Sequence, residues 1–189
     1  MRPKLIGIVG SNADFSFNRI LLQYMKRHFA ETVDIEIQEI NGVPLFCENE
    51  MKTPPAIVNE MADKIEDADG VIIAAPEYDH AIPAALKSVI EWLSSARHPF
   101  NDQHVMIVGA SYGIQGTVRS QMNLRQVLDS LGVNANVLPG NEFMLSNVKD
   151  KFNENGEITD EGTIKFLDSC MNNFLTYSKI GNDANAVLH

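Results

Sequence analysis

The sequence predicts an α/β protein built on a parallel β-sheet with helices on both faces. Short apolar runs typical of strands alternate along the chain with longer segments of helical periodicity, which is the pattern of repeated strand–helix–strand units. The first, third and fourth apolar runs contain almost no polar residue, as expected for interior strands that are buried on both sides. The chain of 189 residues is long enough for one well-packed domain and short for two.

Strands and helices are expected to alternate strictly. The strands are predicted at Lys4–Val9, Val33–Glu39, Gly70–Ala75, His104–Ala110 and Val133–Leu138. The helices are predicted at Ser16–Phe29, Pro55–Asp67, Pro83–Ser95, Thr117–Leu131 and about Thr159–Tyr177. Pro83 suits the first turn of a helix, because its missing N–H would have no helical partner there. The sequence Thr159-Asp160-Glu161-Gly162 is a capping signal before the last helix.

The second strand is predicted to lie at an edge of the sheet. In Val33–Glu39 apolar and polar residues alternate with a period of two, which is typical of a strand with one face in water. A five-stranded parallel sheet with this strand at its edge fits the order 2-1-3-4-5 of a flavodoxin-like three-layer α/β/α sandwich. We expect a single domain over residues 1–180 and a disordered tail over residues 181–189.

Charge and composition argue against several classes of function. A formal net charge of −10 disfavours binding to nucleic acid or to anionic membranes, and no apolar run is long enough to span a bilayer. The N-terminal apolar run is short for a signal peptide and lacks a cleavage site, so we expect a cytoplasmic protein. Cys47 and Cys170 are far apart and form no C-x-x-C pair, which predicts neither a disulfide framework nor a metal site.

The loop Gly10–Asn18, between the first strand and the first helix, has the features of a phosphate site. Ser11, Ser16 and Asn18 could each donate to a phosphate oxygen at the helix N-terminus, where backbone N–H groups are free. The alternative is that Ser16 only caps the helix. The loop has neither the Walker pattern nor the glycine fingerprint of a dinucleotide site.

The loop Pro76–Pro83, after the third strand, suits a flat aromatic cofactor. Its two prolines hold the backbone stiffly and present Glu77, Tyr78 and Asp79. Backbone amides there could bind the polar edge of a flavin, with Tyr78 beside the ring. The alternative is a plain connection in which Asp79 is a turn residue and Tyr78 a half-buried anchor.

The loop Gly109–Gly116 follows the fourth strand, and its glycines permit close approach of the backbone to a ligand or, alternatively, only a tight turn. Each loop is weak evidence on its own. The carboxyl ends of the first, third and fourth strands meet at one crevice of an open α/β sheet, which is where ligands bind. Together the three loops predict one ligand site.

Three motifs make the sequence resemble the NADPH-dependent FMN reductase family, which includes flavodoxin-fold quinone, azo-dye and chromate reductases. The motif G-S-x-R-x-x-S-x-N is matched at Gly10, Ser11, Ser16 and Asn18. The motif P-E-Y-N-x-S-x-P-A-x-L-K is matched at Pro76, Glu77, Tyr78, Pro83, Ala84, Leu86 and Lys87. The motif G-x-S-x-G-x-x-G, with L-R on the next helix, is matched at Gly109, Ser111, Gly113, Gly116, Leu124 and Arg125. The resemblance spans about residues 4–177.

The resemblance implies an enzyme that binds FMN and passes a hydride from NAD(P)H through the flavin to a small acceptor such as a quinone, free flavin, azo compound or metal oxyanion. The flavin carries the chemistry, so no catalytic side chain is expected. The implied cofactor-binding residues are Ser11, Ser16, Phe17, Asn18, Pro76, Glu77, Tyr78, Asp79, Ser111, Tyr112, Gly113 and Gly116. The family resemblance also implies a homodimer or homotetramer.

Two departures from the family motifs bear on FMN binding. The arginine of the first motif is replaced by Ala13, with Asp14 beside it, which should weaken retention of the phosphate unless Arg19 or another subunit compensates. The asparagine of the second motif is Asp79, which keeps acceptors and loses the amide donor, and the hydroxyl position after it is Ala81.

Two other functions remain open at this point. A flavodoxin-type electron carrier would bind FMN and oxidise NAD(P)H slowly, but the first loop lacks the repeated hydroxyl pattern expected of it. A binding protein that has lost FMN would account for Ala13 and Asp14. A response-regulator receiver is set aside, because no acidic pair follows the first strand to hold magnesium.

Overall fold

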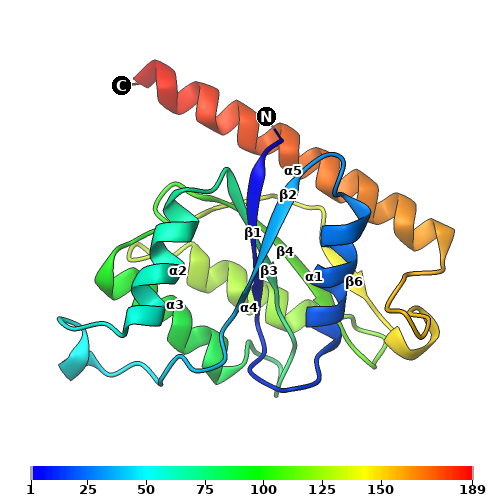
Figure 1. Cartoon of the computed structure of the whole chain (residues 1–189), viewed down its shortest axis with the longest axis horizontal. Coiled ribbons are helices and arrows are strands. Elements are labelled where there is room, and N and C mark those ends of the chain that lie inside the picture. The colour runs from blue at the N-terminus through cyan, green and yellow to red at the C-terminus, as the bar shows by residue number, and fades with distance from the viewer. Residues whose placement is uncertain (1, 189) are drawn as a thin grey trace.

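The computed structural model describes the backbone of residues 2–188 and the side chains of residues 2–179. Over this range one parallel sheet is formed by β1 (Lys4–Val9), β2 (Asp34–Glu39), β3 (Gly70–Ala74), β4 (His104–Ala110), β5 (Asn136–Val137) and β6 (Phe143–Leu145). The strand order is β2-β1-β3-β4-β5, with β6 also paired to β4 (Figure 1). The predicted flavodoxin-like order, with β2 at the edge, is confirmed.

The fifth strand position differs from the sequence analysis. The prediction of one strand at Val133–Leu138 is wrong: β5 pairs with the start of β4, and β6 pairs with its end. Pro139 has no backbone N–H to donate, and Gly140 has a φ of +61°, so the chain leaves the ladder after β5 and rejoins it at β6. The strand is thereby split into two short pieces along the same edge of β4.

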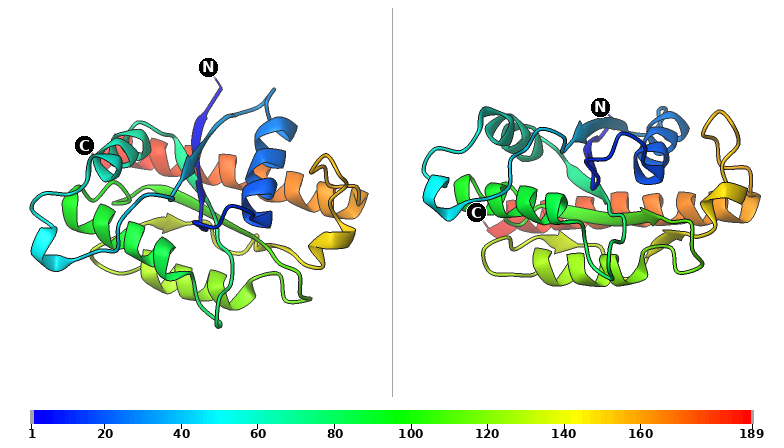
Figure 2. Two further views of the ribbon diagram at one scale, coloured as in Figure 1. Left: turned by 60° about the horizontal axis from the view of Figure 1, so that its bottom comes forward. Right: turned by 90° about the horizontal axis from the view of Figure 1, so that it is seen from below.

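Helices cover both faces of the sheet, as predicted (Figure 2). In the described part of the chain they are α1 (Phe17–His28), α2 (Ala56–Glu66), α3 (Ala84–Ala96), α4 (Val118–Leu128) and α5 (Glu161–Leu188), with 3₁₀ turns at Glu48–Glu50 and Val148–Asp150. Leu5 and Val9 of β1 face a core shared with α1 and α5, and Ile6 and Ile8 face a core shared with α2, α3 and α4. The sheet is therefore buried on both sides, as a parallel sheet requires.

The last helix is longer than predicted. The Asp160 carboxylate caps it by accepting from the N–H of Thr163 at 2.9 Å, and the backbone continues to Leu188 instead of ending near Tyr177. Residues 178–188 contain no proline, and a single glycine costs a helix only about 1 kcal/mol. The predicted tail, residues 181–189, lies outside the residues whose side chains are described, and its disorder stays a prediction. Among the helices described, none is both long and apolar enough to cross a membrane.

Candidate functional site

A cavity of about 330 Å³ lies at the carboxyl ends of β1, β3 and β4, where the three loops singled out in the sequence meet. Its volume falls in the range of small-molecule sites, about 300–1,000 Å³. A second cavity of about 470 Å³ adjoins it and shares Glu77, Ser111 and Gly113 with it. The first cavity is lined by Phe15, Ser16, Phe17, Asn18, Pro76, Glu77, Tyr78, Ala110, Ser111, Tyr112 and Gly113.

The first loop leaves the sheet at Gly10, whose N–H donates to the Ala74 carbonyl at 2.8 Å. A Cβ at Gly10 would lie 2.5 Å from that carbonyl oxygen, so only glycine permits this approach of two strand ends. Ser16 is the N-cap of α1, and its Oγ accepts from the N–H of Arg19 at 3.4 Å. The Ser16 hydroxyl therefore keeps its own hydrogen to donate to a ligand.

The N-terminus of α1 has the properties of an anion site. The N–H groups of Phe17 and Asn18 lie in the first turn and have no partner within the helix. No acidic residue occupies that turn, and both residues line the first cavity. Free N–H groups and the positive end of the helix dipole together favour a phosphate.

Asn18 joins the first loop to the third. Its Nδ2 donates to the Ala110 carbonyl and its Oδ1 accepts from the Ala110 N–H, both at 3.0 Å. The side chain is only 3% exposed. Both ends of the amide are thus used to hold the start of α1 against the end of β4.

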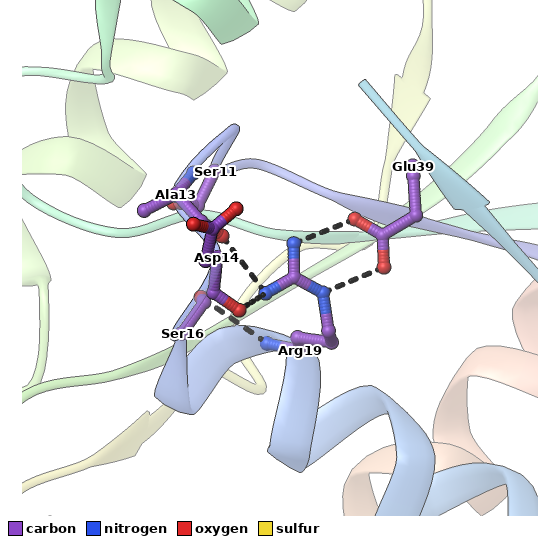
Figure 3. Close-up of polar contacts among 6 residues, drawn as sticks. All are labelled: Ser11, Ala13, Asp14, Ser16, Arg19 and Glu39. Carbon is purple, nitrogen blue, oxygen red and sulfur yellow. Dashed lines mark hydrogen bonds and ion pairs between the residues drawn. The ribbon is translucent and has the colours of Figure 1, made fainter. Parts of the chain in front are cut away.

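Arg19 is directed to the first loop and to Glu39 of β2 (Figure 3). Its Nε and Nη2 donate to the two carboxylate oxygens of Glu39 at 2.6 and 2.8 Å. Its Nη1 donates to the carbonyls of Ala13 and Asp14, each at 3.0 Å. The hydrogen bonds that Arg19 donates to the Glu39 carboxylate raise the pKa of Arg19.

The second loop contains a tight hairpin turn, which agrees with the alternative interpretation of Asp79 as a turn residue. Tyr78 and Ala81 exchange two backbone hydrogen bonds of 3.0 Å across the turn. Asp79 and His80, at its centre, have φ values of +49° and +66°. Two positive φ values are typical of a type I′ turn, in which aspartate is common at the first position and His80 takes the place of the usual glycine at the second. Asp79 and His80 border the second cavity, and Tyr78 stands half exposed beside the first.

Glu77 joins the second loop to α4. Its Oε2 accepts from the backbone N–H groups of Arg119 and Ser120 at 3.0 and 3.3 Å, in the first turn of the helix. The N-cap residue Thr117 has a φ of +73° and makes no side-chain cap, so the Glu77 carboxylate performs that role from another loop. Ser120 Oγ also donates to the Pro76 carbonyl at 2.8 Å.

The third loop is held by its glycines and by the segment after β6. A Cβ at Gly109 would lie 1.8 Å from Oγ1 of Thr117, and Gly116 has a φ of +56°. The Ser111 N–H donates to the Leu145 carbonyl at 2.9 Å. With this backbone in place, the ring of Tyr112 stands 58% exposed over the cavity.

Residues 3–150 match the NADPH-dependent FMN reductase family. The chain belongs to this family. It is accordingly an FMN- and NAD(P)H-dependent oxidoreductase, as the sequence motifs implied. The chain is 45% identical to the NADH-dependent flavin reductase subunit 2 of Lactobacillus johnsonii, with 92% of this chain and 96% of that protein covered. It is 44% identical to the NADH:(hydroxy)cinnamate reductase subunit CrdA of Vibrio ruber, with 93% and 87% covered.

A solved structure shows the same fold. The flavoenzyme NAD(P)H:(acceptor) oxidoreductase FerB of Paracoccus denitrificans superposes with a TM-score of 0.85 at 22% identity, covering 95% of this chain and 98% of that one. The similarity extends well beyond residue 150, where the family match ends. The flavodoxin-like fold is therefore shared over nearly the whole chain.

Three of the residues proposed for this FMN reductase lie outside the first cavity. Ser11 is 1% exposed, and its Oγ accepts from the N–H of Ala13 at 3.2 Å. Asp79 borders the second cavity, and Gly116 is buried and borders neither. The other predicted residues line the first cavity. Ala110 and Phe15 line it too and were not predicted.

Phe15 belongs to an aromatic group beside the cavity. Its ring meets that of Phe17 edge-on at 4.9 Å, and Phe17 in turn meets Tyr112 at 4.9 Å and stacks on Phe152 at 6.2 Å. Phe15 is 61% exposed. A phenylalanine in a loop of small polar residues was the available signal in the sequence.

Proposed function

We propose that the first cavity is the FMN site of this reductase and that quinones and flavins are its electron acceptors. The observation that carries the proposal is that three loops meet around one cavity. The N-terminus of α1, with free N–H groups and no acidic residue, lies on one side of this cavity, and aromatic rings lie on the other. When bound, FMN supplies the two-electron redox chemistry, so the role of the protein is to bind the flavin, to orient it and to shield it from water.

The first loop holds the phosphate in this proposal. The Ser16 hydroxyl and the N–H groups of Phe17 and Asn18 are neutral donors with capacity to spare. The Asn18 side chain acts as a positioning group, because its amide is engaged with Ala110. Arg19 does not contribute its charge directly, because it is paired with Glu39.

The second and third loops hold the ring. Backbone groups around Pro76 and Gly113, the hydroxyl of Ser111 and the exposed rings of Tyr78 and Tyr112 border the space that a flat aromatic system would fill. Glu77, in the second loop, binds the first turn of α4, which follows the third loop, and so fixes the position of the two loops relative to each other. The adjoining second cavity, beside Asp79 and His80, is the place for the nicotinamide and, after it leaves, for the acceptor.

Assembly and location belong to the same proposal. The expected state is a homodimer or homotetramer in the cytoplasm. Two of the relatives carry the word subunit in their names, which supports function within an assembly. Light scattering of the purified protein gives the number of chains directly.

Steady-state turnover tests the function. The protein is saturated with FMN, and loss of NADH or NADPH is followed with and without benzoquinone. Rapid, FMN-dependent oxidation that the quinone accelerates supports the reductase. A flavin that binds but is reduced only slowly would favour the electron carrier, and absence of flavin binding would favour the binding protein that has lost its cofactor.

A further inference from the structure

We infer that Arg19 is a positioning residue for the phosphate of FMN: braced by Glu39, it holds two peptide groups of the first loop in the orientation that an anion needs. The inference rests on the proposed FMN site. Arg19 acts on the backbone and makes no contact with the phosphate itself.

We call the contacts of Arg19 with Glu39, Ala13 and Asp14 the brace. They use four of the five N–H donors of the guanidinium. Two bind the carboxylate of Glu39 at 2.6 and 2.8 Å, and two bind the carbonyls of Ala13 and Asp14 at 3.0 Å. Figure 3 shows the guanidinium lying between the loop and Glu39, so that one planar group links α1, β2 and the loop. The side chains of Arg19 and Glu39 are 17% and 41% exposed, so the guanidinium is partly shielded from water while the carboxylate lies at the surface.

Because a peptide unit is planar, holding its carbonyl also fixes the direction of its N–H group. The peptide bonds of the described residues are trans, so the N–H of each peptide unit points opposite to its carbonyl. With the carbonyls of Ala13 and Asp14 held toward Arg19, the N–H groups of Asp14 and Phe15 point away from it. Without the brace, either peptide could flip and present a carbonyl oxygen to the phosphate, which would repel it.

A direct electrostatic role for Arg19 fits the structure less well. The bidentate Glu39 balances its charge, and the neighbouring Asp14 adds a negative one. An unpaired cation would attract the phosphate at a distance. An arginine whose charge is balanced by a carboxylate acts instead by holding the loop backbone in place. The two roles predict opposite effects when Glu39 loses its charge, and this makes them separable.

The test compares FMN with riboflavin, which lacks the phosphate, in fluorescence titrations of the apo protein. For Arg19→Met and Arg19→Lys we expect FMN affinity to fall about tenfold, as for loss of a charge-assisted hydrogen-bond network, and riboflavin affinity to change less than about threefold. Lysine keeps the positive charge, but its ammonium cannot span two carbonyls and a carboxylate. For Glu39→Gln we expect weaker FMN binding, because the brace loses its anchor.

Arg27→Met is the matched control. Arg27 lies on the same helix and makes a similar pairing, with Glu157 at 2.9 Å and the Gly156 carbonyl at 3.2 Å. It is eight residues from Arg19, about 12 Å along the helix axis. Its loss should leave the ratio of FMN to riboflavin affinity unchanged.

Four results would overturn the inference. Wild-type FMN affinity in Arg19→Lys, or tighter FMN binding in Glu39→Gln, would show that charge alone matters. Equal loss of FMN and riboflavin in the Arg19 variants would show a general effect on the fold. If the wild-type protein binds neither flavin, the proposed function fails and the inference with it, which is a distinct outcome.

Discussion

Asn18 is the residue on which the geometry of the site depends most. It is buried, and its amide gives the Ala110 peptide both a donor and an acceptor. The two residues are 92 positions apart, so nothing local in the sequence identifies the partner. The motif predicted that Asn18 belongs to the site, but the structure was needed to find its contact.

Replacing Asn18 by leucine should destabilise the protein by about 2 kcal/mol, because the buried N–H and C=O of Ala110 would lose their partners. Urea unfolding of the apo protein measures this without the contribution of bound flavin. Asn172→Leu, at an exposed position of α5, is the control and should change stability by less than about 0.5 kcal/mol. Equal effects of the two substitutions would contradict the assignment.

At the scale of the elements, Glu77 shows how one loop stabilises the helix of another. It caps α4 across 42 residues of sequence, in place of Thr117, whose backbone is left-handed. A local capping rule finds Ser16 before α1 and Asp160 before α5, but it cannot find a cap that comes from a distant loop.

We expect Glu77→Ala to lower the free energy of unfolding by about 1 kcal/mol, since two N–H groups at the start of α4 lose their acceptor. The readout is the urea midpoint of the apo protein. Glu142→Ala is a suitable comparison, because Glu142 is an exposed carboxylate that pairs with Arg125 at 3.8 Å. A surface pair of this kind is worth less than about 1 kcal/mol, and a larger effect at Glu142 than at Glu77 would refute the capping role.

The elements themselves were predictable where the pattern is strong. The strands β1, β3 and β4 are almost continuously apolar because both faces are buried, and the sequence shows this directly. The predicted fifth strand ended at Leu138, directly before Pro139 and Gly140, so the second piece beyond them, Phe143–Leu145, was not predicted. The turn at Asp79 was expected only in the alternative interpretation of the second loop. The positive φ value of His80 was not predicted, because this residue stands where a two-residue hairpin turn usually has glycine.

On the scale of the whole molecule, burial in the closed α/β/α sandwich makes stability depend on pH through His104. This residue begins β4, is 3% exposed and meets the ring of Tyr177 from α5 at 5.2 Å. Burial lowers the pKa of His104, while Asp102 acts weakly in the opposite direction. In the unfolded chain a histidine titrates near pH 6.5, so the unfolded state takes up the proton first.

The contribution of His104 to stability is therefore fully present above about pH 6.5 and is lost as the pH falls through the lower pKa of the folded state. Unfolding free energies measured from neutral to mildly acidic pH should fall more steeply for the wild type than for His104→Phe, which cannot titrate. Parallel curves for the two proteins would show that His104 does not contribute.

The central claim for the molecule is that the N-terminus of α1 receives the phosphate of FMN, and Ser16→Asp tests it most directly. Aspartate caps a helix as well as serine does, so the fold should be retained. Its charge, however, would lie beside the phosphate, where two charges about 4 Å apart at a protein surface repel by about 4 kcal/mol.

The measurement is the dissociation constant of FMN for the wild-type and variant apo proteins, with riboflavin in parallel. We predict saturable binding of FMN by the wild type, a loss of at least about tenfold in the variant, and little change for riboflavin. Equal FMN affinity in the two proteins would place the phosphate elsewhere and contradict the account.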